Sequence, residues 1–429
     1  MSVNNWLEVY LHDLCRPKQW KTISTKDLTS TGYTVYGANG IIGCFTDYTH
    51  EKPTLMITCR GATCGNLHIS KPFSYINGNA MALDSLRADI CNMRYLLYFL
   101  KYRGFGDVIS GSAQPQITQE GLKIVSVSLV PLNEQKRIAD KLDQLLAAVD
   151  SCKTRLDTIP GIIKRFRQSV VSSAVLGQLT VEWRSQQSES KDQRHTSSLG
   201  KLCQAGRVIT YGVIKLGDEI SDGVPCLRTS NVRWLRIEIE GIKCIAPSLS
   251  SEFSRTILQG TEVLVNVRGT LGGVAVASSE MKGWNVSREV AVIPVDTSIV
   301  DPDFLALWVA SDISQRWLKE VQRGVAYVGI NIEDLRTLPV ELPPLDEQIE
   351  IVRRVEALFA VADRLETRYQ AARAQVNQLT PSLLAKAFRG ELVPQDPNDE
   401  PAEKLLERIR ASKPATPAKR QTRRNCKQS

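Results

Sequence analysis

Two arginine–glycine pairs carry side chains suited to binding phosphates or bases. Arg60–Gly61 and Arg268–Gly269 each lie between two short runs of strand-forming residues, and each pattern predicts a strand, a turn and a second strand. An arginine at a tight turn can reach a phosphate or the O6/N7 edge of guanine, while the glycine lets the backbone come close. The alternative is that the glycines only shape the turns and each arginine pairs with a carboxylate.

A second polar segment, 227–234, corresponds in position to 36–40 in the earlier part of the chain. Asparagine can pair with adenine through two hydrogen bonds, and arginine can pair with guanine in the same way. Either segment could instead be an ordinary polar loop. The candidate base-contacting residues of these segments are Asn39, Arg228, Asn231 and Arg233.

Cys59, Cys64 and His68 suggest a metal site, but no fourth ligand lies nearby in the sequence. The later part of the chain has Val267 and Gly272 where the first part has the two cysteines. A structural metal would be expected in both places, so we expect none.

Catalytic motifs are missing from the sequence. It has no phosphate-binding loop, no glycine-rich cofactor fingerprint and no Asn- or Asp-Pro-Pro-aromatic methylation motif, since Pro343–Pro344 is followed by Leu345. We therefore expect no catalytic residue and no enzyme activity in the chain itself.

The composition indicates a protein of two or three domains that is not a membrane protein. The chain has 429 residues, of which 42% are hydrophobic and 23% charged. No apolar run approaches the roughly 20 residues that a membrane-spanning helix needs. Ten cysteines without dense, regular spacing favour a reducing compartment, so we expect a cytoplasmic protein with free thiols.

Most of the net positive charge lies at the C-terminus. The last twenty residues carry seven lysines and arginines and no acid, which leaves +1 of the total +8 for the rest (8 − 7). We predict that 394–429 is a disordered basic tail that either holds polyanions or only keeps the chain in solution. Any nucleic-acid site elsewhere must be a local patch.

An internal repeat organises the chain. The sequence Leu-Asn-Glu-Gln at 132–135 returns as Leu-Asp-Glu-Gln at 345–348, a shift of 213 positions (345 − 132). This shift holds without a gap from Gly111 to Gly177, and it shrinks to 208 at the arginine–glycine pairs. The chain therefore contains two copies of one unit, whose front parts differ in length.

Each copy contains a long helix with a coiled-coil seam. Apolar residues recur in alternating steps of three and four from Leu142 to Val170 and from Val355 to Leu383. Asn133 and Asp346 suit the N-caps, and the glycines at 177 and 390 suit the C-caps. Each helix should span about 44 residues, or roughly 65 Å.

Prolines interrupt both seams, so we expect a kink or a break at Pro160 and Pro381. The seams should pack against each other as an antiparallel pair related by a pseudo-twofold axis. The outer faces are then free to dock partners. The docking candidates on the helices are Lys164, Arg165, Arg167, Glu134, Gln135, Glu347 and Gln348.

With these features the chain resembles the specificity subunits of Type I restriction-modification enzymes, in particular their enterobacterial branch. The segments that carry the resemblance are 130–138, 163–169, 343–348 and 385–392. It extends over nearly the whole chain, although the two globular parts match only in outline.

The resemblance implies two target recognition domains that each read one half of a bipartite site in double-stranded DNA. The paired helices would set the unread spacer and dock two methyltransferase subunits, and two restriction subunits would join the complex. A site of about 13 base pairs at 3.4 Å each is roughly 44 Å long, within the reach of such helices. S-adenosylmethionine, ATP and Mg²⁺ are expected on these partners, and no cofactor on this chain.

We therefore predict an α+β protein with two recognition domains separated by two long antiparallel helices. One alternative is a self-contained DNA methyltransferase or nuclease with a diverged active site. Another is a coiled-coil adaptor whose globular parts bind protein. The predicted parts are a first domain at 1–131, a helix at 132–183, a linker at 184–198, a second domain at 199–344, a helix at 345–393 and the tail at 394–429.

Overall fold

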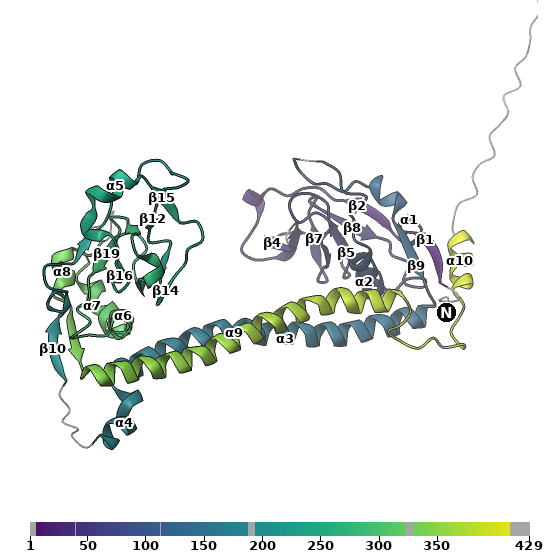
Figure 1. The fold of residues 1–429 in the computed structure, drawn as a ribbon. Helices are drawn as coiled ribbons and strands as arrows, with labels where there is room; N and C mark the ends of the chain where they lie inside the picture. The colour runs from purple at the N-terminus through teal and green to yellow at the C-terminus, as the bar shows by residue number, and fades with distance from the viewer. Residues whose placement is uncertain (1–5, 39, 112, 188–193, 323–328, 412–429) are drawn as a thin grey trace, which may run out of the picture. The chain divides into compact units, whose positions relative to one another are not determined.

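The computed structural model describes residues 6–38, 40–111, 113–187, 194–322 and 329–411. Asn39 of the predicted DNA-binding set, part of the linker and the last 18 residues of the basic tail lie outside these ranges. The chain forms two compact units (Figure 1). Unit 1 comprises Met1–Leu156 and Ala372–Ser429, and unit 2 comprises Asp157–Ala371.

The two long helices are present, and both continue through their prolines. Helix α3 spans Leu132–Val175 and helix α9 spans Leu345–Phe388, each with the predicted 44 residues. The prediction of a break is wrong, because Pro160 and Pro381 lie inside continuous helices. A proline removes only one N–H from the backbone ladder, and the packed seam on either side holds the remaining turns in place.

Both helices end close to a glycine with left-handed backbone, as predicted. Gly177 has φ +69° and Gly390 has φ +75°, a conformation that disfavours residues with a side chain. The predicted ends at 183 and 393 are therefore too late. Residues beyond Gly177 form a separate short helix, α4, at Val181–Gln186.

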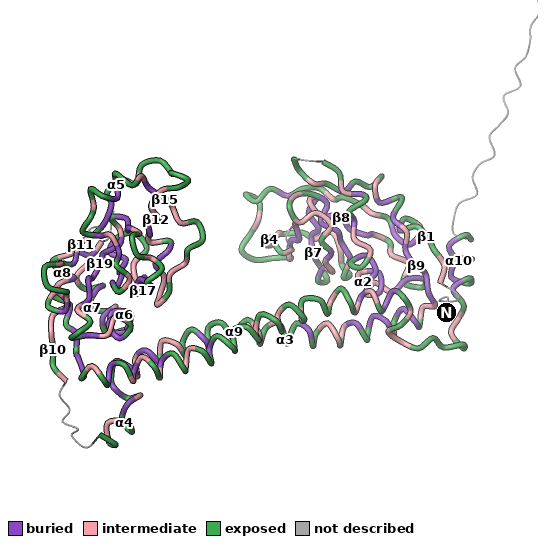
Figure 2. The backbone as a smooth tube through the Cα atoms, in the orientation of Figure 1, coloured by how far each residue is buried: buried purple, intermediate pink, exposed green. Residues whose placement is uncertain are grey.

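Within each unit the segments of the two helices run antiparallel and share a core with the globular domain, as predicted (Figure 1). In unit 1, Leu142 of α3 and Leu384 of α9 belong to one buried cluster. In unit 2, Val171 and Ala174 of α3 are buried with Ile351 of α9. Figure 2 shows the buried residues of α3 and α9 mainly toward the ends of the two helices, with mostly exposed residues between them.

The domain of unit 1 contains a four-stranded sheet of order β2-β8-β5-β6, a three-stranded sheet of order β4-β3-β7 and the pair β1-β9. Its strands are β1 Leu7–Tyr10, β2 Arg16–Gln19, β3 Tyr33–Gly37, β4 Gly40–Phe45, β5 Leu55–Thr58, β6 Leu67–Ile69, β7 Ser74–Ile76, β8 Ala80–Asp84 and β9 Ser126–Leu129. Its helices are α1 Leu11–Leu14, α2 Met93–Arg103 and α10 Ala402–Ala411, with 3₁₀ turns at Thr25–Asp27 and Gly121–Ile124.

The domain of unit 2 has the same three sheets, in the orders β11-β19-β16-β17, β15-β12-β18 and β10-β20, and adds the pair β13-β14. Its strands are β10 His195–Ser198, β11 Thr210–Tyr211, β12 Val224–Leu227, β13 Val232–Arg233, β14 Arg236–Ile237, β15 Lys243–Ile245, β16 Val263–Asn266, β17 Val274–Val276, β18 Asn285–Val286, β19 Val290–Ile293 and β20 Pro339–Leu342. Its helices are α5 Pro247–Glu252, α6 Pro302–Ala310, α7 Asp312–Glu320 and α8 Ile332–Arg336, with 3₁₀ turns at Gln178–Thr180, Leu199–Leu202, Ser254–Thr256 and Ser279–Met281.

The two domains therefore share one topology. In each, the second strand of the three-stranded sheet pairs with one neighbour in parallel, β3 with β7 and β12 with β18. The internal repeat that the sequence predicts is confirmed at the level of strand order, and the fold is α+β as predicted.

The prediction of a disordered tail from residue 394 is wrong for its first part. Helix α10 packs on unit 1, where Leu405 and Ile409 are buried in the domain core. Arg137 of α3 also forms an ion pair with Asp399, at 2.7 Å. These apolar residues at helical spacing outweigh the basic composition on which the prediction rested.

Candidate nucleic-acid interface

The first arginine–glycine pair lies at the end of a β-hairpin, as predicted. Strand β5 pairs antiparallel with β6, and Arg60 follows the end of β5. Gly61 has φ +91°, and its N–H donates to the carbonyl of Pro115 at 3.1 Å. Arg60 is exposed, and among the described residues no hydrogen bond or ion pair engages its guanidinium. It is therefore free to contact a ligand.

The second pair occupies the equivalent place in unit 2. Strand β16 pairs antiparallel with β17, Arg268 follows β16, and Gly269 has φ +71°. The Arg268 guanidinium lies 5.7 Å from the centre of the Tyr211 ring. In the part of the chain that the structure describes, no acid pairs with it, so nothing there supports the alternative in which the turn arginines hold carboxylates.

Asn231 has a structural role in this conformation, which does not support its predicted contact with adenine. The side chain is 1% exposed. Its Oδ1 accepts a hydrogen bond from the Arg228 N–H at 3.0 Å, and its Nδ2 donates to the Glu238 carbonyl at 2.9 Å. Both ends of the amide are used to close the loop before β13, which leaves nothing to offer a base.

The two arginines of the same segment are also engaged. Arg228 donates to the carbonyl of Gly241 at 2.9 Å, and Arg233 donates to the Glu238 carboxylate at 3.0 Å. Arg236 shares that carboxylate at 2.6 Å, and these hydrogen bonds, chiefly the one from Arg233, lower the pKa of Glu238. Arg228 and Arg233 are thus weaker candidates than Arg60 and Arg268.

The repeated glutamines fix each domain to its helix. Gln135 is fully buried and accepts from the Asn92 N–H at 2.8 Å. Its amide nitrogen donates to Ile90 and Val130 at 3.0 and 2.8 Å. Gln348 repeats this pattern in unit 2, accepting from Asp301 N–H at 2.8 Å. These bonds use both amides within the chain, so the structure gives no support to the prediction that the two glutamines contact a partner.

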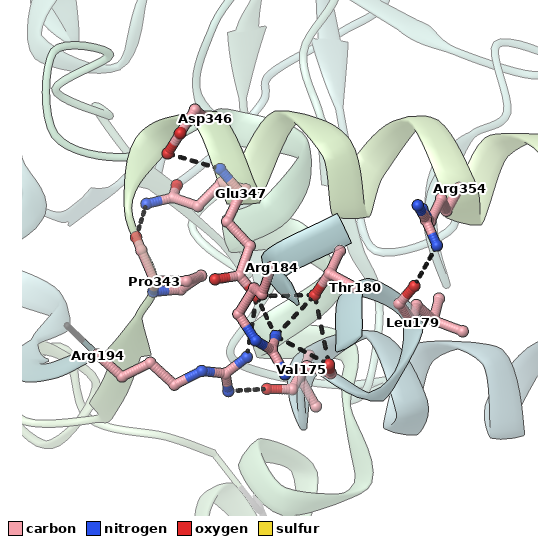
Figure 3. A network of polar contacts seen from close by, with 11 residues as sticks. Val175, Leu179, Thr180, Arg184, Arg194, Pro343, Asp346, Glu347 and Arg354 are labelled. Carbon is pink, nitrogen blue, oxygen red and sulfur yellow. Dashed lines mark hydrogen bonds and ion pairs between the residues drawn. The ribbon is translucent and has the colours of Figure 1, made fainter. Parts of the chain in front are cut away.

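Glu347 is likewise buried, in a polar network at the start of α9 (Figure 3). Its carboxylate accepts from the Thr180 hydroxyl at 2.7 Å and pairs with Arg184 and Arg194. Because Arg194 also donates to the carbonyl of Val175, the network ties the end of α3 to the start of α9 within unit 2.

Glu134, the counterpart of Glu347, is 2% exposed, and burial raises the pKa of its carboxyl. A group this far buried is not presented to another protein. The burial of both glutamates gives no support to their predicted docking role.

The basic cluster on α3 is only partly available. Arg167 pairs with Asp363 at 2.5 Å and with Glu366 at 3.1 Å, so it serves helix pairing inside unit 2. Lys164 and Arg165 are exposed. These two remain candidates for partner docking.

Cys59 and Cys64 were the cysteines that suggested a metal site. Cys59 is buried, where its sulfur accepts a hydrogen bond from Gln19 at 3.0 Å. Across the described residues, no group of three or more His, Cys, Asp or Glu side chains is placed to hold a metal ion. Nor does any described helix have the length and apolar character to cross a membrane.

Comparison with known proteins identifies the class. Residues 4–160 and 228–372 match the family described as the Type I restriction modification DNA specificity domain. The chain is 36% identical to the EcoBI specificity subunit of Escherichia coli over 72% of this chain and 69% of that one. It is 35% identical to the EcoKI specificity subunit of the K12 strain, over 77% and 74% of the two chains.

This chain therefore belongs to the Type I restriction-modification specificity subunits, as the sequence resemblance indicated. A solved structure of a type I system, from work on its complex assembly and conformational transition, matches 91% of this chain with a TM-score of 0.66 at 17% identity. The HsdS subunit of Thermoanaerobacter tengcongensis matches 91% with a TM-score of 0.53, also at 17% identity. These two similarities support the fold.

Sequence reasoning missed Tyr211. This residue lies 57 positions before Arg268 (268 − 211), and no local spacing connects them. Only the pairing of β11 with β19, and of β19 with β16, brings the aromatic ring to the arginine turn. The internal repeat was the signal that could have pointed to Tyr211, since the two copies share one order of strands.

Proposed function

We propose that this chain gives a Type I restriction-modification complex its DNA sequence specificity, and that each domain reads one half of a split site. The observation that carries the proposal is the pair of exposed arginines, Arg60 and Arg268, at the same strand end of two domains with one topology. Duplicated sheets with different surface residues suit two different half-sites, since phosphate contacts fix the register and base contacts specify the sequence.

The long helices suit a spacing role in this proposal. Gln135 and Gln348 hold each domain against the start of its own helix through buried hydrogen bonds. A domain attached in this way cannot swivel freely, so the gap between half-sites would be fixed by the protein. Each helix of 44 residues is about 65 Å long, enough for a site of roughly 44 Å.

We further propose that the chain is not itself catalytic and binds no cofactor. Two methyltransferase subunits would bind S-adenosylmethionine and dock on the helices near Lys164 and Arg165, whose charges are exposed. Two restriction subunits would supply ATP- and Mg²⁺-dependent translocation and cleavage. The complex would act on DNA in the cytoplasm.

Methylome sequencing of cells with and without this gene tests the proposal. The gene's removal should abolish one split adenine-methylation motif with a fixed gap. An unchanged methylome would refute the proposed function. If the purified chain alone transferred methyl groups or cut DNA, the enzyme alternative would hold instead. An assembled complex without sequence-dependent DNA binding would favour the adaptor alternative.

A further inference from the structure

A groove of about 620 Å³ opens beside the second arginine turn, inside unit 2. It is lined by elements distant in sequence: β11, the end of β16, the turn between β18 and β19, and the residues before α8. The lining side chains that matter here are Tyr211, Arg268, Arg288 and Glu289.

Arg268 is held in place on two sides. A side chain at Gly329 would put its Cβ 3.2 Å from the Cγ of Arg268, so the arginine stem lies close against glycine backbone. The two residues also form a β-bridge. The ring of Tyr211 flanks the guanidinium at 5.7 Å. An arginine restrained in this way loses less conformational entropy when it binds.

Arg288 and Glu289 come from the turn between β18 and β19. That turn is fixed by its backbone, because the Arg288 N–H donates to Val213 at 2.9 Å and the Glu289 carbonyl accepts from Val267 at 2.9 Å. Within the described ranges, no hydrogen bond or ion pair engages the side chains of Arg288, Glu289 or Arg268. The groove thus offers two guanidinium groups and one carboxylate, none of them paired with the side chain of another described residue.

This combination discriminates between possible ligands. A backbone phosphate has no hydrogen-bond donor to offer the Glu289 carboxylate, so a site that bound only the DNA backbone would not need this acid. A guanine–cytosine pair offers both complements in the major groove: guanine O6 and N7 accept from arginine, and cytosine N4 donates to a carboxylate. Adenine–thymine pairs offer arginine no such pair of acceptors.

We propose that this groove reads a guanine–cytosine pair in the half-site of unit 2. In this assignment Arg268 contacts guanine, Glu289 accepts from cytosine N4, and Arg288 supports the guanine contact or the adjacent phosphate. The assignment rests on the proposed function and adds the residues and the base pair to it.

The test uses the assembled complex with methyltransferase subunits and duplexes in which each base pair of the methylated motif is changed in turn. Arg268→Lys and Glu289→Ala should each lower the preference for guanine–cytosine at one position of one half-site by about tenfold or more. Lysine keeps the positive charge but loses the planar fork. Arg255→Ala, an exposed arginine of the same unit outside the groove, is the matched control and should change no preference.

Three results would overturn the assignment. The preference at every position could stay within twofold of the original in both variants. Both variants could weaken binding equally for all duplexes, which would mark a phosphate contact. The affected position could prove to be adenine–thymine. Failure of the proposed function is seen separately, as a lack of any split motif in the unsubstituted complex. Thermal unfolding of each variant within 2–3 °C of the original verifies that unit 2 is folded.

Discussion

The side-chain oxygen of Gln135 accepts a hydrogen bond of 2.8 Å from the backbone N–H of Asn92, the residue that caps helix α2. In unit 2, Gln348 accepts in the same way from Asp301, the cap of α6. The repeated Glu-Gln at the start of each long helix thus has a structural purpose. The glutamine of the pair joins that helix to the cap of the helix beside it.

We predict that Gln135→Ala destabilises unit 1 by about 1–3 kcal/mol. The substitution leaves the N–H of Asn92 and the carbonyls of Ile90 and Val130 without their partner, and buried polar groups without hydrogen bonds carry that penalty. Thermal unfolding should shift down by several degrees. Gln144→Ala on the exposed side of the same helix should leave the transition unchanged. Equal stability of the two variants would contradict the anchoring role.

We predict that Leu405→Ala lowers the stability of unit 1 by about 2–5 kcal/mol, because this fully buried leucine belongs to the domain core. Denaturant unfolding followed by tryptophan fluorescence measures the loss. Glu407→Ala, at an exposed position of the same helix, serves as the control. Should both variants unfold alike, α10 would not be part of the core.

We predict a pH-dependent contribution from Glu262, whose side chain is fully buried. Burial raises the pKa of its carboxyl, but hydrogen bonds from Arg207 at 2.8 Å and from backbone N–H groups outweigh this effect. The pKa therefore lies below its ordinary value of 4.5. A lowered folded-state pKa means stability that is fully present above 4.5 and is lost as the pH falls through the folded-state pKa.

Glu262→Gln should accordingly lower stability at pH 7 by on the order of 1–3 kcal/mol. The difference between the original chain and the variant should shrink as the pH falls below 4.5. Unfolding midpoints measured from pH 7 down to pH 3 give this comparison, with the exposed Glu280→Gln as the control. A difference that stays constant over this range would show that the carboxyl does not titrate as inferred.

We predict that Arg60→Ala weakens or relaxes recognition of only one half of the methylated motif. Arg60 is exposed at the hairpin end of unit 1, far in sequence from the residues of unit 2. Methylome sequencing of cells carrying the variant measures the effect. Arg389→Ala, whose guanidinium already pairs with Glu391, is the control. An unaltered methylation pattern would remove Arg60 from the interface.

Periodic features of the fold were predictable from the sequence. The seams from Leu142 to Val170 and from Val355 to Leu383 repeat over many turns, so single exceptions such as Pro160 did not obscure the 44-residue helices. The two hairpins were equally clear, because strand runs flank glycines that the turns require.

Polar residues were harder to place. Asn231 and Gln135 have side chains that suit DNA or partner contacts, and a sequence does not show that both are buried and satisfied by neighbouring backbone. The groove beside Arg268 was also beyond prediction, because strand pairing brings Tyr211 and Glu289 together from separate segments. Helix α10 was missed because the prediction for 394–429 rested on the basic composition of the last twenty residues. The residues before them, which form most of the helix, were not considered separately.

The make-up of the two units also bears on synthesis at the ribosome. Unit 2 is one continuous stretch, whereas the core of unit 1 includes Leu384 and Leu405 from the far end of the chain. Unit 1 begins before unit 2 but cannot close its core until α9 and α10 have left the ribosome, whereas all residues of unit 2 have been translated by Ala371.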